Sequence, residues 1–506
     1  MNYAELLNSF YMLLNWDTFV FINVGLLVGI IFGSLPGLTT VMGVTLALPF
    51  TFNMAPTTGI GMLLGVYCGG VYGGSITAIL IRTPGTPASA ATLNDGFELT
   101  KKGLALKAMQ MALYASVISG IISALMLLFI APQLAKVALK FGSAEYFALA
   151  VFGLSVVIAV NSNILKGIAA ACIGMLIKTV GLDPIDGLDR FTFDLLDLSG
   201  GIELVPALIG LFAVSEILRR IDDLRKTGKL SVPATTGGSL TMAEFLPSLK
   251  TIVKSSFIGT FIGAVPGTGA VTSSFLAYNE ARRSSKNPEQ FGKGSLEGIA
   301  ASEAGNNGIT GATLIPMLTL GIPGDIIAAI LLGALMVHGL IPGPKLFENH
   351  ATEVYGMIFS LFIINILMIF HALAYIKIYK NVMKINPYLF TSILFIFCVS
   401  GCYAVNNSLF DVQVMMVFGM IGFFLPKFDY PLTPLLMGIV LGPIAESSFR
   451  QALTISKGSY VIFVSHPLSA VILAASTLIL LFSAYKQLTT KSQKQSEPED
   501  THQATL

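Results

Sequence analysis

The stretch SLEGIAASEAGNNGITGATLIPMLTLGIPGD, residues 295–325, decides how the rest of the chain is interpreted. It is apolar enough to lie in a lipid bilayer, yet it carries Glu303, Asn306, Asn307 and Asp325. Unpaired polar groups are costly in hydrocarbon, so these side chains must face protein, water or a ligand. The Gly-Ile-Pro-Gly run before Asp325 predicts an interrupted helix, the kind of element from which ion-coupled transporters build their binding sites.

The composition indicates a membrane protein. Of the 506 residues, 54% are hydrophobic and 11% are charged, whereas soluble proteins carry about 25% charged residues. Apolar runs long enough to cross a bilayer recur along the chain, and 50 glycines favour close helix packing and broken helices. A net charge of +2 does not suggest a nucleic-acid partner. We expect an all-α polytopic membrane protein with about 11–13 transmembrane helices, some of them broken or re-entrant.

The second half of the chain repeats the first. Gly-Ser-Leu-Pro-Gly at 33–37 corresponds to Gly-Ala-Val-Pro-Gly at 263–267, and Thr-Pro-Gly at 83–85 corresponds to Ile-Pro-Gly at 322–324. Two further pairs follow in the same order: 161–163 with 406–408, and 206–219 with 434–450. Chance similarity between apolar segments is the alternative, but four pairs in register favour a duplication.

Charge sets the expected orientation. The basic stretch around 219–254 should be cytoplasmic, and no basic residue precedes Arg82, so we expect an external N-terminus, an odd number of crossings and inverted-topology repeats. The predicted segments are an interfacial segment (1–17), a first transmembrane repeat (18–222), a cytoplasmic linker (223–250), a second transmembrane repeat (251–456), a final transmembrane helix (457–485) and a disordered cytoplasmic tail (486–506).

The paired breaks predict the binding site. Pro removes a backbone donor and Gly relaxes the dihedral constraint, so each Pro-Gly pair exposes amides suited to a carboxylate and carbonyls suited to a hard cation such as sodium. Any single pair could merely kink a helix; four in register are more specific. The candidate substrate- or ion-binding residues are Pro36, Gly37, Thr39, Thr40, Arg82, Thr83, Pro84, Gly85 and Thr86 in the first repeat, and Pro266, Gly267, Thr268, Gly269, Glu303, Asn306, Asn307, Pro323, Gly324 and Asp325 in the second.

Each of three charged residues has two possible roles. Glu303 either binds a cation or a proton, as intramembrane carboxylates usually do, or pairs structurally with an Asn or Arg. Asp325 either joins that site or caps the next helix. Arg82 either pairs with an anionic substrate or is an Arg at a loop edge whose head group reaches the interface. We expect no metal site beyond a possible sodium ion near Asn306 and Asn307, and no cofactor other than the coupling ion.

The residues resemble those of a known family. The stretches GSLPGLT (33–39), YGGSITAILIRTPGTPASAATLNDGF (72–97), GTFIGAVPGTGA (259–270), EGIAASEAGNNGITGATLIPMLTLGIPGD (297–325) and HGLIPGP (338–344) are similar to the TctA family, the large membrane subunit of tripartite tricarboxylate transporters. The resemblance runs from about residue 20 to 455. It implies a bacterial inner-membrane, cation-coupled carboxylate importer with two partners, a periplasmic solute-binding protein and a small four-helix membrane subunit.

We therefore expect a secondary active transporter subunit that imports small di- or tricarboxylates by Na⁺ or H⁺ symport. The alternatives are a passive anion channel and a single-subunit carboxylate symporter. An enzyme is not expected, because the sequence contains no HExxH motif and no second intramembrane Asp comparable to Asp325. No P-loop is present, so any ATPase would be a separate chain.

Overall fold

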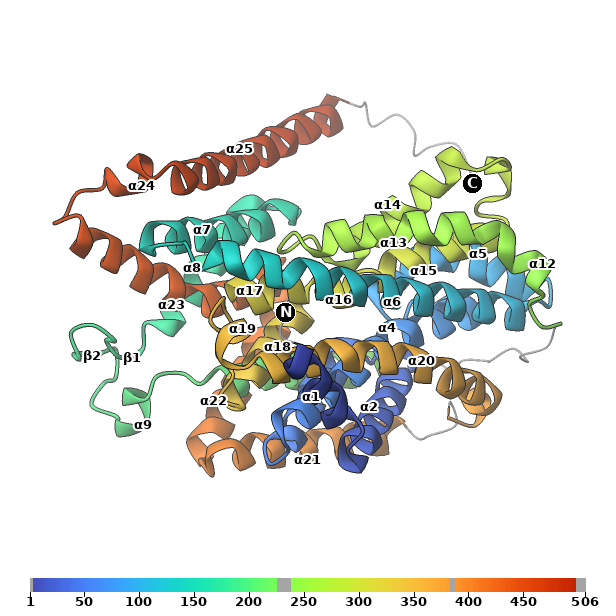
Figure 1. The fold of residues 1–506 in the computed structure, drawn as a ribbon, viewed down its shortest axis with the longest axis horizontal. Helices are drawn as coiled ribbons and strands as arrows, with labels where there is room; N and C mark the ends of the chain where they lie inside the picture. The colour runs from blue at the N-terminus through green and yellow to red at the C-terminus, as the bar shows by residue number, and fades with distance from the viewer. Residues whose placement is uncertain (1–2, 225–237, 383–386, 497–506) are drawn as a thin grey trace. The chain divides into compact units, whose positions relative to one another are not determined.

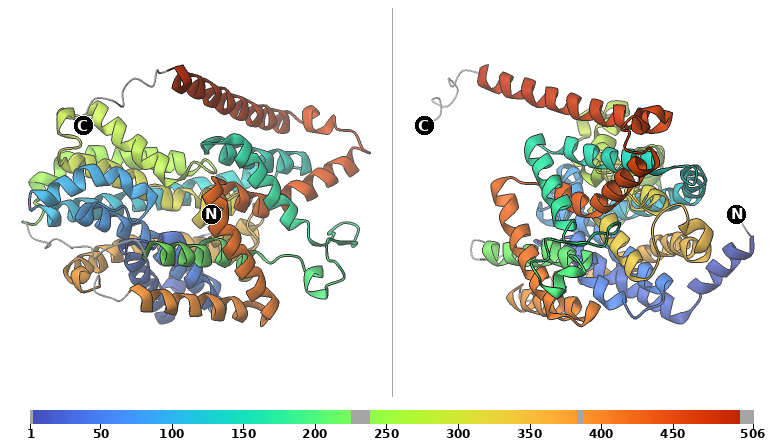
Figure 2. Two further views of the ribbon diagram at one scale, coloured as in Figure 1. Left: turned by 180° about the vertical axis from the view of Figure 1, so that it is seen from behind. Right: turned by 90° about the vertical axis from the view of Figure 1, so that its left-hand side faces the viewer.

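The computed structural model describes residues 3–224, 238–382 and 387–496, and these are almost entirely helical (Figures 1 and 2). Nine helices in this described part are long and apolar enough to cross a membrane, and the apolar helices Thr40–Thr51 and Ile326–Val337 are shorter. The prediction of an all-α polytopic membrane protein is confirmed. The described residues also form a two-stranded antiparallel sheet, in which Gly181 pairs with Arg190.

The first half of the chain contains the following elements: α1 (Tyr3–Leu13), α2 (Trp16–Ser34), α3 (Thr40–Ala47), η1 (Leu48–Thr51), α4 (Pro56–Ile81), η2 (Pro87–Ser89), α5 (Ala90–Lys101), α6 (Ala105–Ala138), α7 (Ser143–Val160), α8 (Ile164–Lys178), β1 (Gly181–Leu182), β2 (Asp189–Arg190), α9 (Leu196–Ser199), α10 (Leu204–Leu208), the π-helical η3 (Ile209–Val214) and α11 (Ser215–Leu224).

The second half contains α12 (Met242–Phe245), η4 (Leu246–Ser248), α13 (Leu249–Gly263), α14 (Gly269–Ser284), η5 (Pro288–Gln290), α15 (Leu296–Asn307), α16 (Ile309–Ala312), α17 (Leu314–Leu320), α18 (Ile326–Val337), α19 (Leu346–Asn349), α20 (Ala351–Val382), α21 (Pro387–Asn406), α22 (Leu409–Phe424), η6 (Leu425–Phe428), α23 (Leu432–Ile455), α24 (Ile462–Ser465) and α25 (Pro467–Ser496).

The order of elements repeats as the motif pairs require. The helix–break–helix series α2, α3, α4, α5 is followed by the long α6, and the series α13, α14, α15–α17, α18 is followed by the long α20. Figure 1 shows α6 and α20, which pack against each other, running in opposite directions. Equivalent helices that run antiparallel are what inverted repeats require, so this arrangement supports the predicted inversion.

The chain forms two compact units that cut across the repeats. The first comprises Met1–Lys140 and Glu203–Phe424, and the second Phe141–Ile202 and Leu425–Leu506. Within the second unit α8 packs on α23, where a Cβ atom on Gly438 would overlap the backbone of Ala171. Within the first unit the repeat counterparts of these helices, α22 and η3, pack on each other, and a Cβ on Gly210 would overlap the backbone of Met415. The same glycine-mediated contact therefore occurs once in each unit.

A buried carboxylate fixes the start of α15. Asp95, on α5, is fully buried, and its Oδ1 accepts hydrogen bonds from the amides of Gly292, Gly294 and Ser295 at 2.8–2.9 Å. Its Oδ2 accepts one from the hydroxyl of Tyr278 at 2.8 Å. Because Asp95 belongs to the first repeat and its partners to the second, this carboxylate joins the repeats directly before the helix that carries Glu303.

Three segment boundaries differ from the predictions. The expected interfacial segment 1–17 is divided, because the Asn15 side chain caps a new helix and Trp16 begins α2. The linker 223–250 lies partly outside the described residues, and its described end forms α12, η4 and the first turn of α13. The tail predicted to be disordered from 486 is helical to Ser496, since the residues that follow Tyr485 contain no helix breaker before Pro498. The remainder, 497–506, lies outside the described residues.

The Asp95 contacts predict a stability effect. Replacing Asp95 by Asn keeps the side-chain volume but removes the charge, and hydrogen bonds to a charged group are worth about 1.5–3 kcal/mol each. We expect Asp95→Asn to lower the Tm of the detergent-purified protein by several degrees. Asp197→Asn, at an exposed carboxylate in α9, is the matched control. Equal Tm values for the two variants would contradict this account.

Candidate functional site

Glu303 lies at the centre of a buried polar cluster in the first unit. Its side chain is fully buried, and its carboxylate accepts hydrogen bonds from the hydroxyls of Thr92 on α5 and Ser116 on α6, the latter at 3.4 Å. The Thr92 hydroxyl also lies 2.8 Å from that of Ser302. Among the ion pairs of the described residues, none includes Glu303. A buried carboxylate surrounded by hydroxyl groups instead of a basic partner is suited to hold a proton or a small cation.

The two asparagines of α15 have different environments. Asn307 donates from Nδ2 to the Ser116 hydroxyl at 2.8 Å and to the Glu303 carbonyl at 3.1 Å. Asn306 follows Glu303 by three residues, which places both on one side of the helix. It is 1% exposed, and neither its Oδ1 nor its Nδ2 has a hydrogen-bond partner in the structure. Asn307 is thus bonded within the cluster, whereas both polar atoms of Asn306 are buried and unpaired.

Further unpaired polar groups lie in the same unit. The hydroxyl of Tyr72 on α4 is buried without a hydrogen-bond partner and lies close to the Glu303 carboxylate, and the buried hydroxyl of Ser75 on the same helix also lies close to this carboxylate. The hydroxyls of Thr40 and Thr313 are also buried and unpaired. Leaving a buried polar group unsatisfied costs about 1–3 kcal/mol, so several such groups on neighbouring helices indicate a site that a ligand completes.

The breaks meet in pairs within each repeat. In the first repeat Gly85 donates its amide to the carbonyl of Gly74 at 3.2 Å, and a Cβ on Gly85 would overlap the Gly33 carbonyl. In the second repeat Gly267 donates its amide to the carbonyl of Gly324 at 2.7 Å. Gly37 and Gly267 both have positive φ, at 75° and 80°, which explains why glycine follows Pro36 and Pro266. Each predicted half-site is therefore a compact structural element.

Most of the predicted threonines are engaged in the local backbone. Thr39 caps α3 by accepting from the Met42 amide at 3.2 Å, and Thr86 forms a capping box with Ser89. Thr83 and Thr268 donate to carbonyls of the helices that precede them, at 3.4 and 2.7 Å. These hydroxyls are used to end and begin helices, so Thr40 is the residue of this set that remains for a ligand.

Asp325 and Arg82 lie at helix ends. Asp325 caps α18, accepting from the Ala328 amide at 2.7 Å, and its Oδ2 also accepts from the hydroxyl of Tyr67 on α4 at 3.0 Å. Asp325 therefore caps α18 and in addition links the two repeats, and whether it also joins the binding site stays a prediction. Arg82 is exposed at the end of α4, with φ of 57° and its guanidinium 5.8 Å from the ring centre of Phe97.

A second arginine, which the sequence interpretation assigned to a cytoplasmic loop, reaches the first break. Arg220 lies on α11, and its Nη1 donates to the carbonyl of Pro36 at 3.3 Å. Its Nε is buried without a partner. Because Arg220 follows two other charged residues, Glu216 and Arg219, its sequence context gave no indication of a buried role. The structure thus places a partly unsatisfied cation beside Pro36-Gly37.

A row of serines on α6 supports the broken helix of the second repeat. Ser119 donates to the Ala304 carbonyl at 2.5 Å, and Ser123 donates to the Gly308 carbonyl at 2.6 Å. The Ser123 hydroxyl also accepts from the amides of Gly311 and Ala312. The spacing 116, 119, 123 is that of one helix face, so this polar face was recognisable in the sequence. The contacts of Ser123 show that the helical segment α15–α17 is interrupted near 308–313, before it ends at Gly321.

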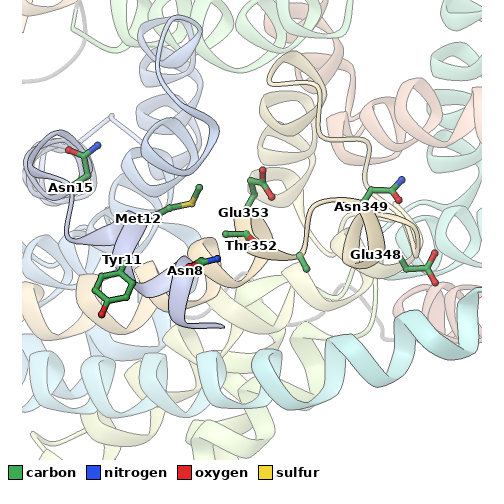
Figure 3. A pocket seen from close by; sticks show the side chains of 9 residues that line it. Asn8, Tyr11, Met12, Asn15, Glu348, Asn349, Thr352 and Glu353 are labelled. Carbon is green, nitrogen blue, oxygen red and sulfur yellow. The ribbon is translucent and has the colours of Figure 1, made fainter. Parts of the chain in front are cut away.

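A surface cavity of about 740 Å³ lies elsewhere in the first unit and contains none of the predicted residues (Figure 3). Residues from α1 and its C-terminal turn face residues of α19 and α20 across it (Figure 3). Its lining is Asn8, Tyr11, Met12, Asn15, Glu348, Asn349, Ala351, Thr352 and Glu353. It is open to the surface and lacks a buried unpaired group, so the Glu303 cluster is the better candidate site.

Comparisons with known proteins agree with the resemblance. Residues 19–437 match the family described as the tripartite tricarboxylate transporter TctA family. An uncharacterized 52.8 kDa protein of the TAR-I ttuC' 3' region of Agrobacterium vitis is 37% identical over 480 residues, covering 94% of this chain and 95% of that protein. A protein of the TAR-II ttuC' 3' region is 36% identical over 235 residues, covering 46% of this chain and 96% of that protein. No solved structure matches.

The family model spans most of a chain whose helices are apolar enough to cross a membrane and whose second half repeats the first. This chain belongs to the TctA family and is a multi-pass membrane subunit of a tripartite tricarboxylate transporter.

Proposed function

We propose that this chain imports small di- or tricarboxylates across the bacterial inner membrane by symport with Na⁺ or H⁺. In this proposal a periplasmic solute-binding protein supplies the substrate, a small four-helix membrane subunit completes the assembly, the N-terminus is periplasmic and the C-terminus is cytoplasmic. The observation that carries the proposal is the fully buried Glu303, which has hydroxyl donors and no basic partner in the described structure.

The coupling ion is assigned to this cluster by its chemistry. Oxygen ligands suit a hard cation, and the cluster offers the Glu303 carboxylate, the nearby Ser75 hydroxyl and the unpaired oxygens of Tyr72 and Asn306. A proton on Glu303 would satisfy the same carboxylate without further ligands. In both cases the cation neutralises a charge that is expensive in a medium of low dielectric constant. Binding and release of the cation would then change the stability of this unit's conformation, and this change would couple cation movement to substrate transport.

The substrate carboxylate is assigned to the first break. Arg220 offers a fixed positive charge and an unpaired Nε beside Pro36-Gly37, and a guanidinium matches the geometry of a carboxylate. The N-terminus of α14 is a further candidate, because Thr268 provides no side-chain cap there, whereas Thr39, Thr86 and Asp325 cap the helices after the other three breaks. A substrate with two or three carboxylates could use both places.

Reconstituted uptake tests the proposal. The complete transporter in proteoliposomes should accumulate a labelled tricarboxylate when an inward Na⁺ or H⁺ gradient is imposed, and the gradient that drives accumulation identifies the coupling ion. Accumulation should vanish when both gradients are collapsed. Equal flux with and without the gradients would favour a passive channel, and full activity of this chain in the absence of partners would favour a single-subunit symporter.

Glu303→Gln tests the coupling site directly. The amide keeps the shape of the side chain but carries neither the charge nor an exchangeable acidic proton, so we expect gradient-driven accumulation to fall by about 100-fold or more. Glu297→Gln is the matched control, because Glu297 lies on the same helix but bonds to Thr251 and Ser285 outside the cluster. Unchanged coupling in Glu303→Gln would rule out Glu303 as the coupling residue.

Arg220→Gln tests the substrate site. Loss of a charged hydrogen bond to a carboxylate corresponds to roughly 10–100-fold in affinity, and we expect the KM for the carboxylate to rise by that factor. The neighbouring Arg219→Gln serves as control, since Arg219 bonds to Glu216 and to the Gly422 carbonyl. If KM is the same in Arg220→Gln and the parent protein, the substrate does not bind Arg220.

Gly85→Leu tests whether the paired breaks are needed. Its side chain would overlap the Gly33 carbonyl and force the two breaks of the first repeat apart, so we expect uptake to be abolished while membrane insertion persists. Gly238→Leu is the control, because a Cβ there meets only the Lys107 side chain at 3.7 Å. Wild-type uptake by correctly inserted Gly85→Leu protein would show that the close contact is dispensable.

A further inference from the structure

The second unit carries a connection that the fold itself does not require. In the first repeat, α8 is joined to α10 by residues 179–203, which contain β1, β2 and α9. In the second repeat, the equivalent helices α22 and α23 are joined by residues 425–431 alone. A short segment is therefore enough to make this connection. Figure 1 shows β1, β2 and α9 protruding from the helices of the same unit. We refer to residues 181–197 as the hairpin loop.

The hairpin loop is held in one conformation by charged contacts. Arg450 on α23 donates to both oxygens of Asp183, at 2.9 and 2.7 Å, and to Asp186 at 2.5 Å. Arg190 donates to Asp183 and, at 2.7 Å, to Glu446. Burial opposes the charged form of Asp183, but the Ile185 amide and the two arginines hold the pKa of that carboxyl well below its usual range. These contacts fix the loop to α23.

The fixed loop displays apolar side chains outside the helices that could span a membrane. Leu188, Phe193 and Leu196 are 68%, 79% and 88% exposed. Four further residues are also exposed: Leu182, Ile185, Phe191 and Leu195. Phe191 and Phe193 have φ of 53° and 50°, a left-handed conformation that is strained for aromatic residues. An exposed apolar patch of this kind, held in place against backbone strain, is typical of an interaction surface.

The charge of the patch distinguishes between possible occupants. Asp189, Asp194 and Asp197 are exposed carboxylates among the apolar residues. They would repel the anionic lipids of a bacterial membrane and also a second copy of the same loop. They would attract a protein surface with an apolar centre and a basic rim. We take the chain from residue 204 to lead across the membrane to the basic linker, as the sequence predicts, so under the proposed orientation the loop faces the periplasm.

We propose that the hairpin loop is the docking surface for the water-soluble partner that delivers the substrate, and that this partner presents an apolar patch surrounded by basic residues. This inference rests on the proposed function for the existence of that partner. Phe193 and Leu196 provide the apolar contact, because they are the most exposed apolar side chains of the loop. The three aspartates provide attraction at longer range and so act mainly on the association rate. Arg450 and Arg190 keep the loop ready to bind, which reduces the entropy lost on binding.

The experiment measures binding of the purified solute-binding protein of the same transporter to the complete membrane complex in neutral-lipid nanodiscs. We expect Phe193→Ser combined with Leu196→Ser to weaken binding by about 10-fold or more, as truncation of central apolar residues does. The variant carrying Asp189→Asn, Asp194→Asn and Asp197→Asn should associate more slowly and lose salt dependence. Val464→Ser, at a residue of α24 in the same unit that is 71% exposed, is the control and should bind normally.

A second readout separates this inference from the transport proposal. Uptake by the complete transporter should be restored in the loop variants by a saturating concentration of the solute-binding protein, because saturation compensates for weaker binding, and it should stay lost in Glu303→Gln. Normal binding by both loop variants would overturn the docking assignment. If the variants lose only binding to vesicles containing phosphatidylglycerol, the loop binds lipid and the docking assignment is overturned. If only the oligomeric state changes, the loop contacts a second copy of this chain and the docking assignment is likewise overturned. Uptake by the loop variants that stays lost at saturating solute-binding protein would also overturn the docking assignment, because the loop would then serve transport itself.

Discussion

The proposed coupling site depends on the buried position of one carboxylate. Glu303 is fully buried on a broken helix and is surrounded by hydroxyl groups instead of a basic residue. In such surroundings an ionised carboxylate is unstable until a proton or a cation joins it, and a neutralised one is readily accommodated. A site whose stability depends on the presence of a cation can couple the movement of that cation to a change in the protein. The rest of the first unit can be understood as the framework that keeps this carboxylate away from other charges.

That framework is built by close backbone packing and by polar contacts between the repeats. The two breaks of each repeat meet through close backbone contacts, Gly85 with Gly33 and Gly267 with Gly324. At position 85 this contact requires glycine, because a Cβ atom would overlap the Gly33 carbonyl. Asp95 then fixes the start of α15, and Ser123 on α6 satisfies the backbone that the interruption near Gly308 leaves free. Each of these contacts joins elements from different parts of the chain, so the duplication and the site are structurally inseparable.

Sequence reasoning recovered the parts of this arrangement that have a periodic or compositional signal. The apolar runs predicted the helices, the four Pro-Gly motifs predicted the breaks, and the carboxylate in an apolar segment predicted Glu303. It missed residues whose role depends on tertiary contacts. Thr92 and Ser116 look like ordinary helix residues until folding places them beside Glu303. Arg220 looks like a cytoplasmic arginine, and only the packing of α11 shows that it reaches Pro36. The hydroxyls of Thr39 and Thr86, which were predicted to bind a ligand, instead cap helices, because a local backbone amide is the nearest partner for such a hydroxyl.

The most direct test of the central claim is infrared difference spectroscopy of the purified transporter, recorded on addition of Na⁺ and on a step in pH. The account predicts a buried carboxyl band that disappears in Glu303→Gln and that responds to one of the two cations: it shifts on Na⁺ binding at constant pH, or it converts to carboxylate as the pH rises. If no band attributable to Glu303 responds to either Na⁺ or pH, the carboxylate at the centre of the cluster does not bind the coupling ion.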